Sequence, residues 1–340
     1  MMIESQTDYF KYIDSFSGLS ISTIIEVFGH VVTNAEYTVS ITVYKRAAFL
    51  RQCLESAIHQ DTTIPYEIIV VDDDPMRNNE VQTLMNDYSN VPNLSYYKKT
   101  KNEGLMDNMN RSIMLARTDW VLLIHDDDWL CEDYLQIIDN YHRKYPDYTI
   151  LVPSHTTFYF DKFIETKSSF REWMCKMKGC WRIRPLDFID GTCATPTGVL
   201  YHKDSFIQSG GYAKQYGMAA DYVFFAKYSS ENKILRINEK LFNYRFAENE
   251  SLKSETTDNF KVIGHYLSVY LMKRYSWLPK SVCDRYERTR LWISCKSDEL
   301  EIRRLFGDGV YEEYRKVPSS NFIYRIINFY VKASVFFKGV

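Results

Sequence analysis

Along residues 37–145 the hydrophobic pattern changes period in a regular way. Short aliphatic runs of strand length, "TVSITVY", "EIIVV" and "WVLLI", are each followed by a stretch whose apolar residues recur at helical spacing, such as "AAFLRQCLESAIHQ". Strands that alternate with helices build a mostly parallel sheet with helices on both faces. We therefore predict an α/β fold with a Rossmann-like sheet and the aliphatic runs at its buried centre.

The two ends of the chain have different patterns. Residues 1–36 combine polar residues with a short apolar patch, "LSISTIIEVF", and we interpret them as an N-terminal helical extension. The α/β domain is predicted to cover residues 37–255. Residues 256–340 have a pattern that indicates a helical C-terminal region.

Composition and charge narrow the class of protein. With 45% hydrophobic and 25% charged residues, the 340-residue chain can bury a full core. A net charge of −2 and a pI near 6.4 give no electrostatic case for a nucleic-acid partner. Residues 261–340 carry 15 Lys/Arg against 8 Asp/Glu, a net +7, so residues 1–260 carry −9. The two parts are therefore expected to face different partners.

The sequence predicts neither a membrane span nor a signal peptide. No run of about 18 apolar residues is present, and the first residues lack the basic-then-apolar order of a signal peptide. The odd number of cysteines, seven, favours reduced thiols over a disulfide framework. We expect a cytoplasmic protein.

Two strongly apolar strands each end in three carboxylates, Asp72–Asp74 and Asp126–Asp128. Open parallel sheets bind ligands outside the carboxyl ends of their strands. Clustered carboxylates raise one another's pKa unless a cation joins them, and Mg²⁺ sites use one or two carboxylates together with substrate phosphates. The alternative is that each run is a solvated turn. The repeat at two strand ends favours a ligand site that holds Mg²⁺ or Mn²⁺.

The first triplet also suggests a receiver domain, in which an acidic pair holds Mg²⁺ beside a phosphorylated Asp. In such a domain the acidic pair follows the first strand, whereas here a strand and a helix precede it. The position of the phospho-acceptor is taken by Ile124. A receiver-like domain is thus a remote alternative.

Taken together, five segments resemble the family 2 glycosyltransferases. They are "VSITVYKRAAFLRQCLESAIHQ", "EIIVVDDDP", "NEGLMDNMNRS", "ARTDWVLLIHDDDW" and "GGYAKQYGMAADYVFF", and the likeness runs from about Tyr37 to Ser251. The resemblance implies a GT-A fold and an inverting enzyme that uses a nucleotide-activated sugar, most often a UDP-sugar. It also implies a role in bacterial surface-polysaccharide assembly, such as O-antigen or capsule synthesis.

The resemblance assigns donor-binding roles to matching positions. Thr42 and Tyr44, at the end of the first strand of the domain, would line the nucleotide pocket. Asp73 would accept a hydrogen bond from the base, and Asn102 and Gly104 would shape the loop beneath it.

The second triplet corresponds to the Asp-x-Asp motif of the family. Asp126 would contact the ribose or the donor sugar, and Asp127 would bind the Mn²⁺ or Mg²⁺ ion that bridges the two phosphates. The chain departs from the family in that His125 replaces the commoner first Asp. In "LFNYRFAENES", Arg245 would pair with phosphate, whereas Ala247 replaces the usual His.

Asp221 matches the general base of the family. Single-displacement transfer needs a carboxylate that takes the proton of the acceptor hydroxyl. The preceding residue is Ala220 where the family often has Glu. The alternative role for Asp221 is that of a helix N-cap.

The segment 320–338 predicts an amphipathic helix with a polar stripe. Its wide apolar face, bordered by Arg and Lys, suits either the membrane interface or docking on the protein itself. The first alternative would place the enzyme on the inner face of the cytoplasmic membrane, with a glycan or lipid-linked glycan as acceptor.

Two functions remain open from the sequence. The first is an inverting, metal-dependent glycosyltransferase. The second, suggested by His125, Ala220 and Ala247, is a non-catalytic nucleotide-sugar or carbohydrate-binding module on a degenerate glycosyltransferase fold.

Overall fold

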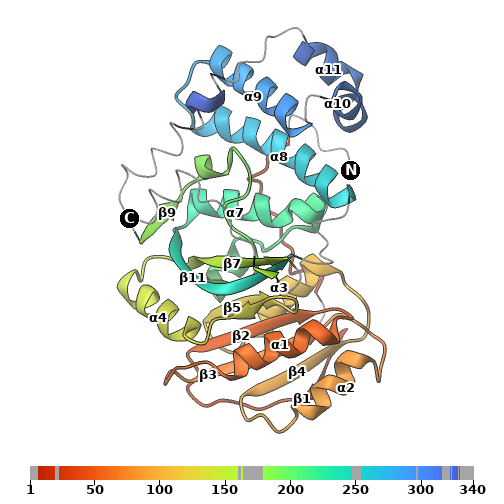
Figure 1. Cartoon of the computed structure of the whole chain (residues 1–340), viewed down its shortest axis with the longest axis vertical. Coiled ribbons are helices and arrows are strands. Elements are labelled where there is room, and N and C mark those ends of the chain that lie inside the picture. Colours follow the sequence, from red (N-terminus) through yellow and green to blue (C-terminus); the bar gives the residue numbers. More distant parts are fainter. Residues whose placement is uncertain are drawn as a thin grey trace.

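A computed structural model describes residues 7–19, 23–159, 162–163, 179–246, 254–295 and 298–315, together with 322, 324–327 and 329. The sheet lies at one end of the elongated molecule and the C-terminal helices at the other (Figure 1). The described strands are β1 (Ile24–Phe28), β2 (Tyr37–Val43), β3 (Tyr66–Asp72), β4 (Leu94–Lys99), β5 (Trp120–His125), β6 (Trp129–Leu130), β7 (Ile150–Tyr159), β8 (Lys162–Phe163), β9 (Cys180–Ile183), β10 (Val199–His202) and β11 (Ile234–Phe246). The described helices are α1 (Ala47–Ile58), α2 (Glu80–Asp87), α3 (Leu105–Leu115), α4 (Tyr134–Lys144), α6 (Lys203–Gln208), α7 (Ala220–Glu231), α8 (Ser254–Tyr275), α9 (Lys280–Ser294), α10 (Glu299–Phe306) and α11 (Asp308–Arg315), with 3-10 turns η2 (Pro185–Phe188) and η3 (Lys214–Ala219).

The strands form one mixed sheet in the order β1-β4-β3-β2-β5-β10-β7-β11-β6, with β8 paired to β7 and β9 paired to β11. The run β4-β3-β2-β5 is parallel throughout, as the alternation of strands and helices predicts. The sheet as a whole is more mixed than predicted, because β10 runs antiparallel to both β5 and β7. β11 then runs parallel to β7.

The parallel register places the two acidic triplets at one edge of the sheet. Val43 at the end of β2 pairs with Asp72 of β3, and Thr42 pairs with His125 of β5. The residues that follow these strands therefore leave the sheet side by side, and both triplets flank the end of β2.

Helices cover both faces of the sheet because successive strand residues point to opposite sides. Leu122 and Ile124 of β5 belong to a core with α1, α2 and α4. Val121 and Leu123 belong to a second core with α3, α7 and α8. The cysteines in the described ranges are free thiols, as predicted.

The prediction of a helical N-terminal extension is wrong for the described residues. Residues 7–19 contain turns and bends but no helix, and Ile24–Phe28 form strand β1, which pairs antiparallel with β4. The apolar run "STIIEVF" is short and rich in β-branched residues, so it is better suited to pair with an open sheet edge than to form a helix.

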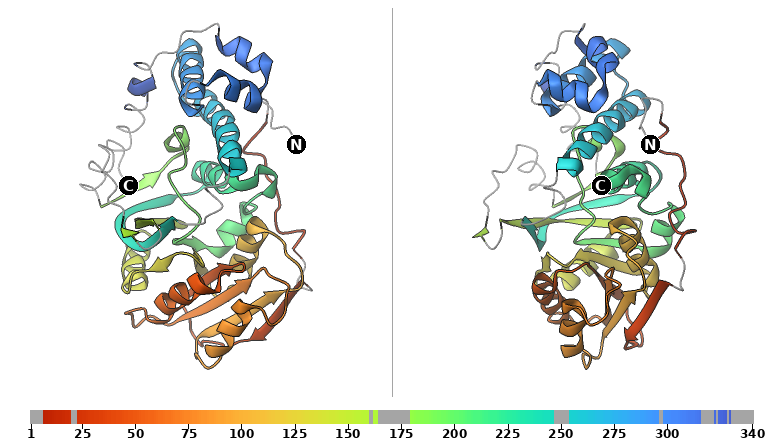
Figure 2. Two further views of the ribbon diagram at one scale, coloured as in Figure 1. Left: turned by 45° about the vertical axis from the view of Figure 1, so that its right-hand side comes forward. Right: turned by 90° about the vertical axis from the view of Figure 1, so that its right-hand side faces the viewer.

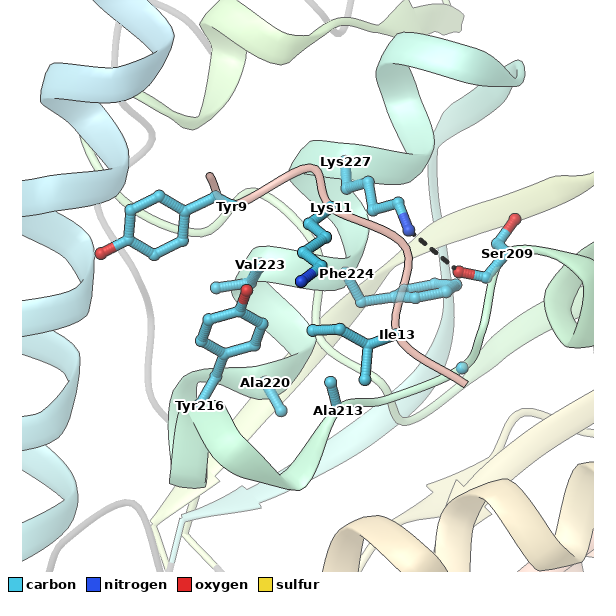
Figure 3. Close-up of a pocket in the computed structure, with 11 residues that line it drawn as sticks. Tyr9, Lys11, Ile13, Ser209, Ala213, Tyr216, Ala220, Val223, Phe224 and Lys227 are labelled. Atoms are coloured by element: carbon cyan, nitrogen blue, oxygen red, sulfur yellow. Dashed lines mark hydrogen bonds between the residues drawn. The ribbon is translucent and has the colours of Figure 1, made fainter. Parts of the chain in front are cut away.

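The segment before β1 crosses the outside of the second core. Tyr9 is buried between Tyr216 and Tyr270, with ring centroids 5.8 and 5.7 Å away. Together with Lys11 and Ile13 it closes a small pocket over η3 and α7 (Figure 3). This segment therefore joins the α/β domain to α8.

The helical C-terminal region is confirmed over α8–α11. α8 packs on the sheet domain, and α9–α11 form a small core of their own at the end of the molecule (Figures 1 and 2). Of the predicted amphipathic segment 320–338, only 322, 324–327 and 329 lie within the described residues. There Ile327 is buried in the second core and Tyr324 stacks on Tyr286 at 5.1 Å, so this part docks on the protein. None of the helices described is both long enough and apolar enough for a membrane span.

Candidate functional site

The first acidic triplet divides into three different roles. Asp72 is buried and accepts hydrogen bonds from Tyr96 Oη (2.8 Å) and Lys98 Nζ (2.7 Å) inside the sheet. Asp74 holds the turn by accepting from the Asn79 side chain at 3.0 Å. Asp73 lies between them and is the carboxylate that reaches the loop before α3.

Asp73 organises the Asn-x-Gly loop. Its two oxygens accept the backbone N–H groups of Glu103 (3.0 Å) and Gly104 (2.9 Å). Gly104 has φ +85°, a conformation that glycine adopts without strain, and it begins α3. Asn102 is exposed on the same loop. Asp73, Asn102 and Gly104 are thus brought together, as the resemblance implied.

A buried ion network supports this loop from below. Lys99 Nζ lies 3.0 Å from both Asp73 and Glu103, and Arg111 pairs with Glu103 at 2.8 Å. Burial raises the pKa of Asp73, and the nearby Lys99 opposes that effect. Nothing in the sequence marked Lys99 or Arg111 as partners of the site.

Thr42 and His125 meet across β2 and β5. The Thr42 hydroxyl and His125 Nδ1 lie 2.8 Å apart. Burial lowers the pKa of His125 to about 4, so the imidazole is neutral at pH 7. Beyond Thr42, the residue Tyr44 is 41% exposed, and Lys45 Nζ lies 4.9 Å from its ring centroid. The position that usually carries an acidic ligand in the family is therefore uncharged here.

Asp126 and Asp127 share one cation, the guanidinium of Arg46. Arg46 Nη1 donates to Asp127 Oδ2 at 2.7 Å, and Arg46 Nε donates to Asp126 Oδ2 at 3.2 Å, while Nη2 pairs with the second oxygen of Asp126. Burial raises the pKa of Asp126 to about 7, and Arg46 counteracts part of that rise. Sequence reasoning gave Arg46 no role, although it stands in the turn "TVYKRA" that resembles the family's opening motif.

Asp128 has a structural role, because its carboxylate accepts hydrogen bonds from two other segments of the chain. It accepts the Thr197 hydroxyl at 2.6 Å and the backbone N–H of Arg245 at 2.9 Å. Thr197 in turn accepts the backbone N–H of His125 at 3.1 Å. Burial raises the pKa of Asp128 well above its ordinary value. The third carboxylate therefore ties β11 and the loop before β10 to the end of β5.

Arg245 lies directly behind Asp127. Its Nε donates to the Asp127 carbonyl oxygen at 3.1 Å, and the guanidinium lies between the rings of Phe49 (4.7 Å) and Trp129 (4.9 Å). The side chain is buried, and it also donates to Gln52. The structure thus brings Arg245 to the site, and a phosphate contact stays a prediction.

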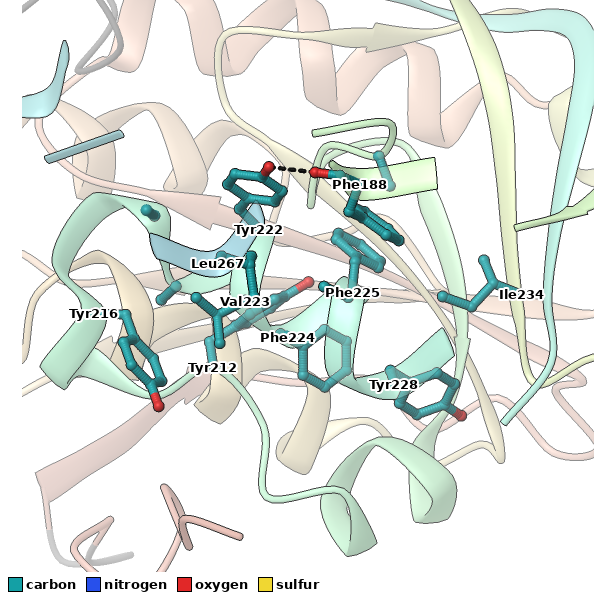
Figure 4. Packing of buried hydrophobic residues seen from close by; sticks show 14 of the residues in the cluster. Phe188, Tyr212, Tyr216, Tyr222, Val223, Phe224, Phe225, Tyr228, Ile234 and Leu267 are labelled. Carbon is teal, nitrogen blue, oxygen red and sulfur yellow. Dashed lines mark hydrogen bonds between the residues drawn. The ribbon is translucent and has the colours of Figure 1, made fainter. Parts of the chain in front are cut away.

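Asp221 occupies the first turn of α7. Its carboxylate accepts the backbone N–H of Tyr222 at 2.7 Å. Burial raises its pKa to about 7, which that hydrogen bond partly counteracts. Aromatic side chains hold the rest of α7 in place, because Tyr222, Phe224 and Phe225 pack in the second core (Figure 4).

A buried tyrosine pair lies close enough to Asp221 to feel its charge. Tyr201 Oη lies 2.7 Å from Tyr212 Oη and donates to the carbonyl of Pro196 at 3.2 Å. Burial raises the pKa of both phenols, and the nearby Asp221 carboxyl adds to the rise. Pro196 precedes Thr197, the partner of Asp128, so the tyrosine pair is tied to the segment that holds the third carboxylate.

The described side chains form no ready-made cage of three or more His, Cys, Asp or Glu around a cation. The donor set at the end of β5 is instead a pair of carboxylates that converge on one cation. Such a pair fits a hard divalent ion that takes its remaining ligands from phosphate and water.

Comparison with known proteins identifies the family. The model of glycosyl transferase family 2 matches residues 38–209, which include β2, β3, β5 and both acidic triplets. The chain belongs to glycosyltransferase family 2. The match ends before Asp221 and Arg245, so their roles rest on the resemblance of the individual segments.

Relatives of this family 2 glycosyltransferase include chondroitin synthase of Escherichia coli, 23% identical over 247 residues, which cover 71% of this chain and 34% of that protein. An uncharacterized glycosyltransferase of Mycoplasma genitalium is 28% identical over 110 residues, covering 32% of this chain and 37% of the relative. The chain thus spans about a third of the length of these curated relatives.

The fold matches that of S. aureus TarS residues 1–349, solved in complex with UDP-GlcNAc. The TM-score is 0.56 at 14% identity, and the match covers 88% of this chain and 92% of the TarS chain. The predicted α/β fold of the GT-A type, with a helical C-terminal segment, is therefore confirmed.

Proposed function

We propose that this family 2 glycosyltransferase moves a sugar, with inversion, from a UDP-sugar to a glycan or lipid-linked glycan acceptor. The observation that carries the proposal is the register of β2, β3 and β5, which sets Asp73 and the Asp126–Asp127 pair at the same sheet edge. The complex of TarS with UDP-GlcNAc and the name of the chondroitin synthase relative support a nucleotide-sugar donor and a polymeric acceptor.

In this proposal one end of the donor lies over Asp73. A carboxylate has about four lone-pair positions, so Asp73 can accept the imide N–H of uracil while it holds Glu103 and Gly104. Thr42, Tyr44 and Asn102 would line the nucleotide pocket around it. Asp126 would contact the ribose or the donor sugar.

The other end of the donor is its diphosphate, beside Asp127. Because Asp126 and Asp127 already converge on one cation, the pair fits Mn²⁺ or Mg²⁺, with Asp127 as the more accessible ligand. The ion would offset the charge that develops on the departing nucleoside diphosphate. Arg245, held behind Asp127, would add positive potential on that side.

Asp221 is proposed as the general base. One of its carboxylate oxygens takes the proton of the acceptor hydroxyl while that oxygen bonds to the anomeric carbon. The bond from that carbon to the diphosphate breaks on the opposite face, which inverts the configuration. A base works best with a pKa close to the operating pH, and burial raises the pKa of Asp221 to about 7.

We further propose a role in surface-polysaccharide assembly at the inner face of the cytoplasmic membrane. The C-terminal charge excess of +7 in residues 261–340 supports contact with anionic lipid. Sedimentation with anionic and neutral vesicles tests this part separately.

The test of the main proposal is a thermal-shift panel of UDP-, dTDP- and GDP-sugars with and without Mn²⁺. A ligand that binds only the folded protein raises the melting temperature by mass action. We expect a metal-dependent rise with a UDP-sugar, which Asp127→Ala abolishes. Asp221→Asn should retain that rise but lose slow hydrolysis of the same donor. If wild type binds donor without any turnover, the binding-module alternative holds. Full transfer activity in Asp221→Asn would refute the base assignment.

A further inference from the structure

The geometry points to Arg46 as a tethered cation that competes with the divalent metal for Asp126 and Asp127. In the free protein its guanidinium neutralises the carboxylate pair, and metal binding releases it toward the donor diphosphate. This inference rests on the proposed function and adds a positioning residue to it.

Arg46 covers the carboxylates from the solvent side. Its side chain is 34% exposed, whereas those of Asp126 and Asp127 are 0% and 9% exposed. Arg46 stands at the turn between β2 and α1, where its side chain starts from the sheet edge that carries both triplets. A metal ion arriving from solvent would therefore meet the guanidinium before it reaches the carboxylates.

The charges explain why a cation is needed there in either state. Asp126 and Asp127 are adjacent, and two carboxylates that share a site repel each other. The neighbouring His125 imidazole contacts the Thr42 hydroxyl instead, with its Nδ1 2.8 Å from that oxygen. The bidentate contact of Arg46 with Asp126 supplies the missing charge, and a divalent ion would replace it.

Release of Arg46 would suit the arriving donor. The guanidinium is planar and matches the paired oxygens of a phosphate as well as those of a carboxylate. A metal at Asp127 would hold the diphosphate beside the position that Arg46 leaves. The same positive charge then serves the carboxylates before binding and the phosphates after binding.

Competition of this kind has a measurable consequence. Arg46 and the metal ion are two competitors for the same carboxylates. If one competitor is removed, the affinity of the other rises by the factor that couples them, which is typically between about 5- and 150-fold. Arg46→Gln should therefore bind Mn²⁺ more tightly than wild type when no nucleotide is present. Arg46→Lys should lie between them, because an ammonium group is a point charge that cannot bridge both carboxylates as the fork does.

The experiment titrates Mn²⁺ alone into wild type, Arg46→Gln and Arg46→Lys, and follows the resonance of free Mn²⁺ by electron paramagnetic resonance. Arg51→Gln is the matched control, since Arg51 lies on α1 with a 57% exposed side chain and an ion pair of 3.9 Å to Asp87. Circular dichroism checks that each variant is folded. We expect Arg46→Gln to bind Mn²⁺ at least fivefold more tightly than wild type, and Arg51→Gln to bind it as wild type does. The double variant Arg46→Gln with Asp127→Asn should lose this gain in Mn²⁺ affinity.

Equal or weaker Mn²⁺ binding by Arg46→Gln and Arg46→Lys would overturn the inference. A second titration, of UDP in the presence of saturating Mn²⁺, tests the other half, and weaker UDP binding by Arg46→Gln is expected. If no variant binds UDP while Arg46→Gln still binds Mn²⁺ more tightly, the donor proposal fails and the competition stands. If UDP binding is metal-dependent in every variant but substitution of Arg46 does not change the Mn²⁺ affinity, the donor proposal stands and the competition fails.

Discussion

Asp221→Asn should stabilise the protein while it removes turnover. The wild-type carboxylate is buried, and burial raises its pKa from 3.8 to about 7. At about 1.4 kcal/mol for each pH unit between these values, ionised Asp221 destabilises the folded state by about 4 kcal/mol. Asparagine keeps an oxygen that accepts the Tyr222 N–H and carries no charge. The general base itself contributes between about 10²- and 10⁴-fold to the rate, so turnover falls by that factor.

The size of this stability difference depends on pH. Well below pH 3.8 the carboxyl is protonated in the folded and unfolded states, and the charge penalty is absent. As the pH rises toward 7, the unfolded chain releases its proton first, so stability is lost progressively through that interval. The advantage of Asp221→Asn is then about 2 kcal/mol at pH 5 and about 4 kcal/mol at pH 8.

Urea unfolding of both proteins at pH 5 and pH 8 measures this advantage. The decisive quantity is its change between the two pH values, expected to lie between about 2 and 3 kcal/mol, because constant differences in packing cancel. An advantage that does not change with pH would mean that Asp221 keeps an ordinary pKa. The assignment of Asp221 as a base tuned by burial would then be refuted.

Three further predictions concern the site and its scaffold. The kcat/KM of transfer should fall below pH 7, to about a tenth of its plateau at pH 6, because Asp221 must be ionised to act; a profile that stays flat to pH 5 would contradict this. Gly198→Ala should lower the free energy of unfolding by about 2 kcal/mol or more, since Gly198 has φ +67° and a Cβ there would overlap the Phe242 ring. Gly309→Ala, in open space on α11, is its control and should not destabilise. Tyr9→Phe should raise stability by about 1 kcal/mol in the same urea assay, because the Tyr9 hydroxyl is buried without a hydrogen-bond partner among the described residues; a loss instead would indicate a partner.

The sequence was sufficient to predict the parallel part of the sheet. Short aliphatic runs alternate clearly with stretches of helical period between 37 and 145, and the acidic triplets follow the most apolar strands. The meeting of Asp73 with Gly104 was also predictable, because the family resemblance covers both positions. The antiparallel strand β10 was not, since nothing local specifies the direction in which a short apolar run joins a sheet.

Two misses have a common physical reason. The patch around Ile24–Phe28 is amphipathic in neither period, and only the open edge of β4 makes it a strand. Arg46 likewise stands alone in its turn, and its partners Asp126 and Asp127 lie 80 and 81 residues further along the chain. Long-range electrostatic partners leave no periodic signal, whereas strands and helices do.

The N-terminal segment has a consequence for the order in which the chain can be assembled. Asp8 accepts the hydroxyl of Tyr270 at 2.7 Å across 262 residues of sequence. At about 5 to 20 residues per second, the ribosome needs between roughly 13 and 52 seconds to make that stretch. Tyr9 and its neighbours are thus synthesised long before the helix α8 that helps to bury them, so this contact cannot form during that time. The segment therefore reaches its native partners only after the chain has been made as far as α8.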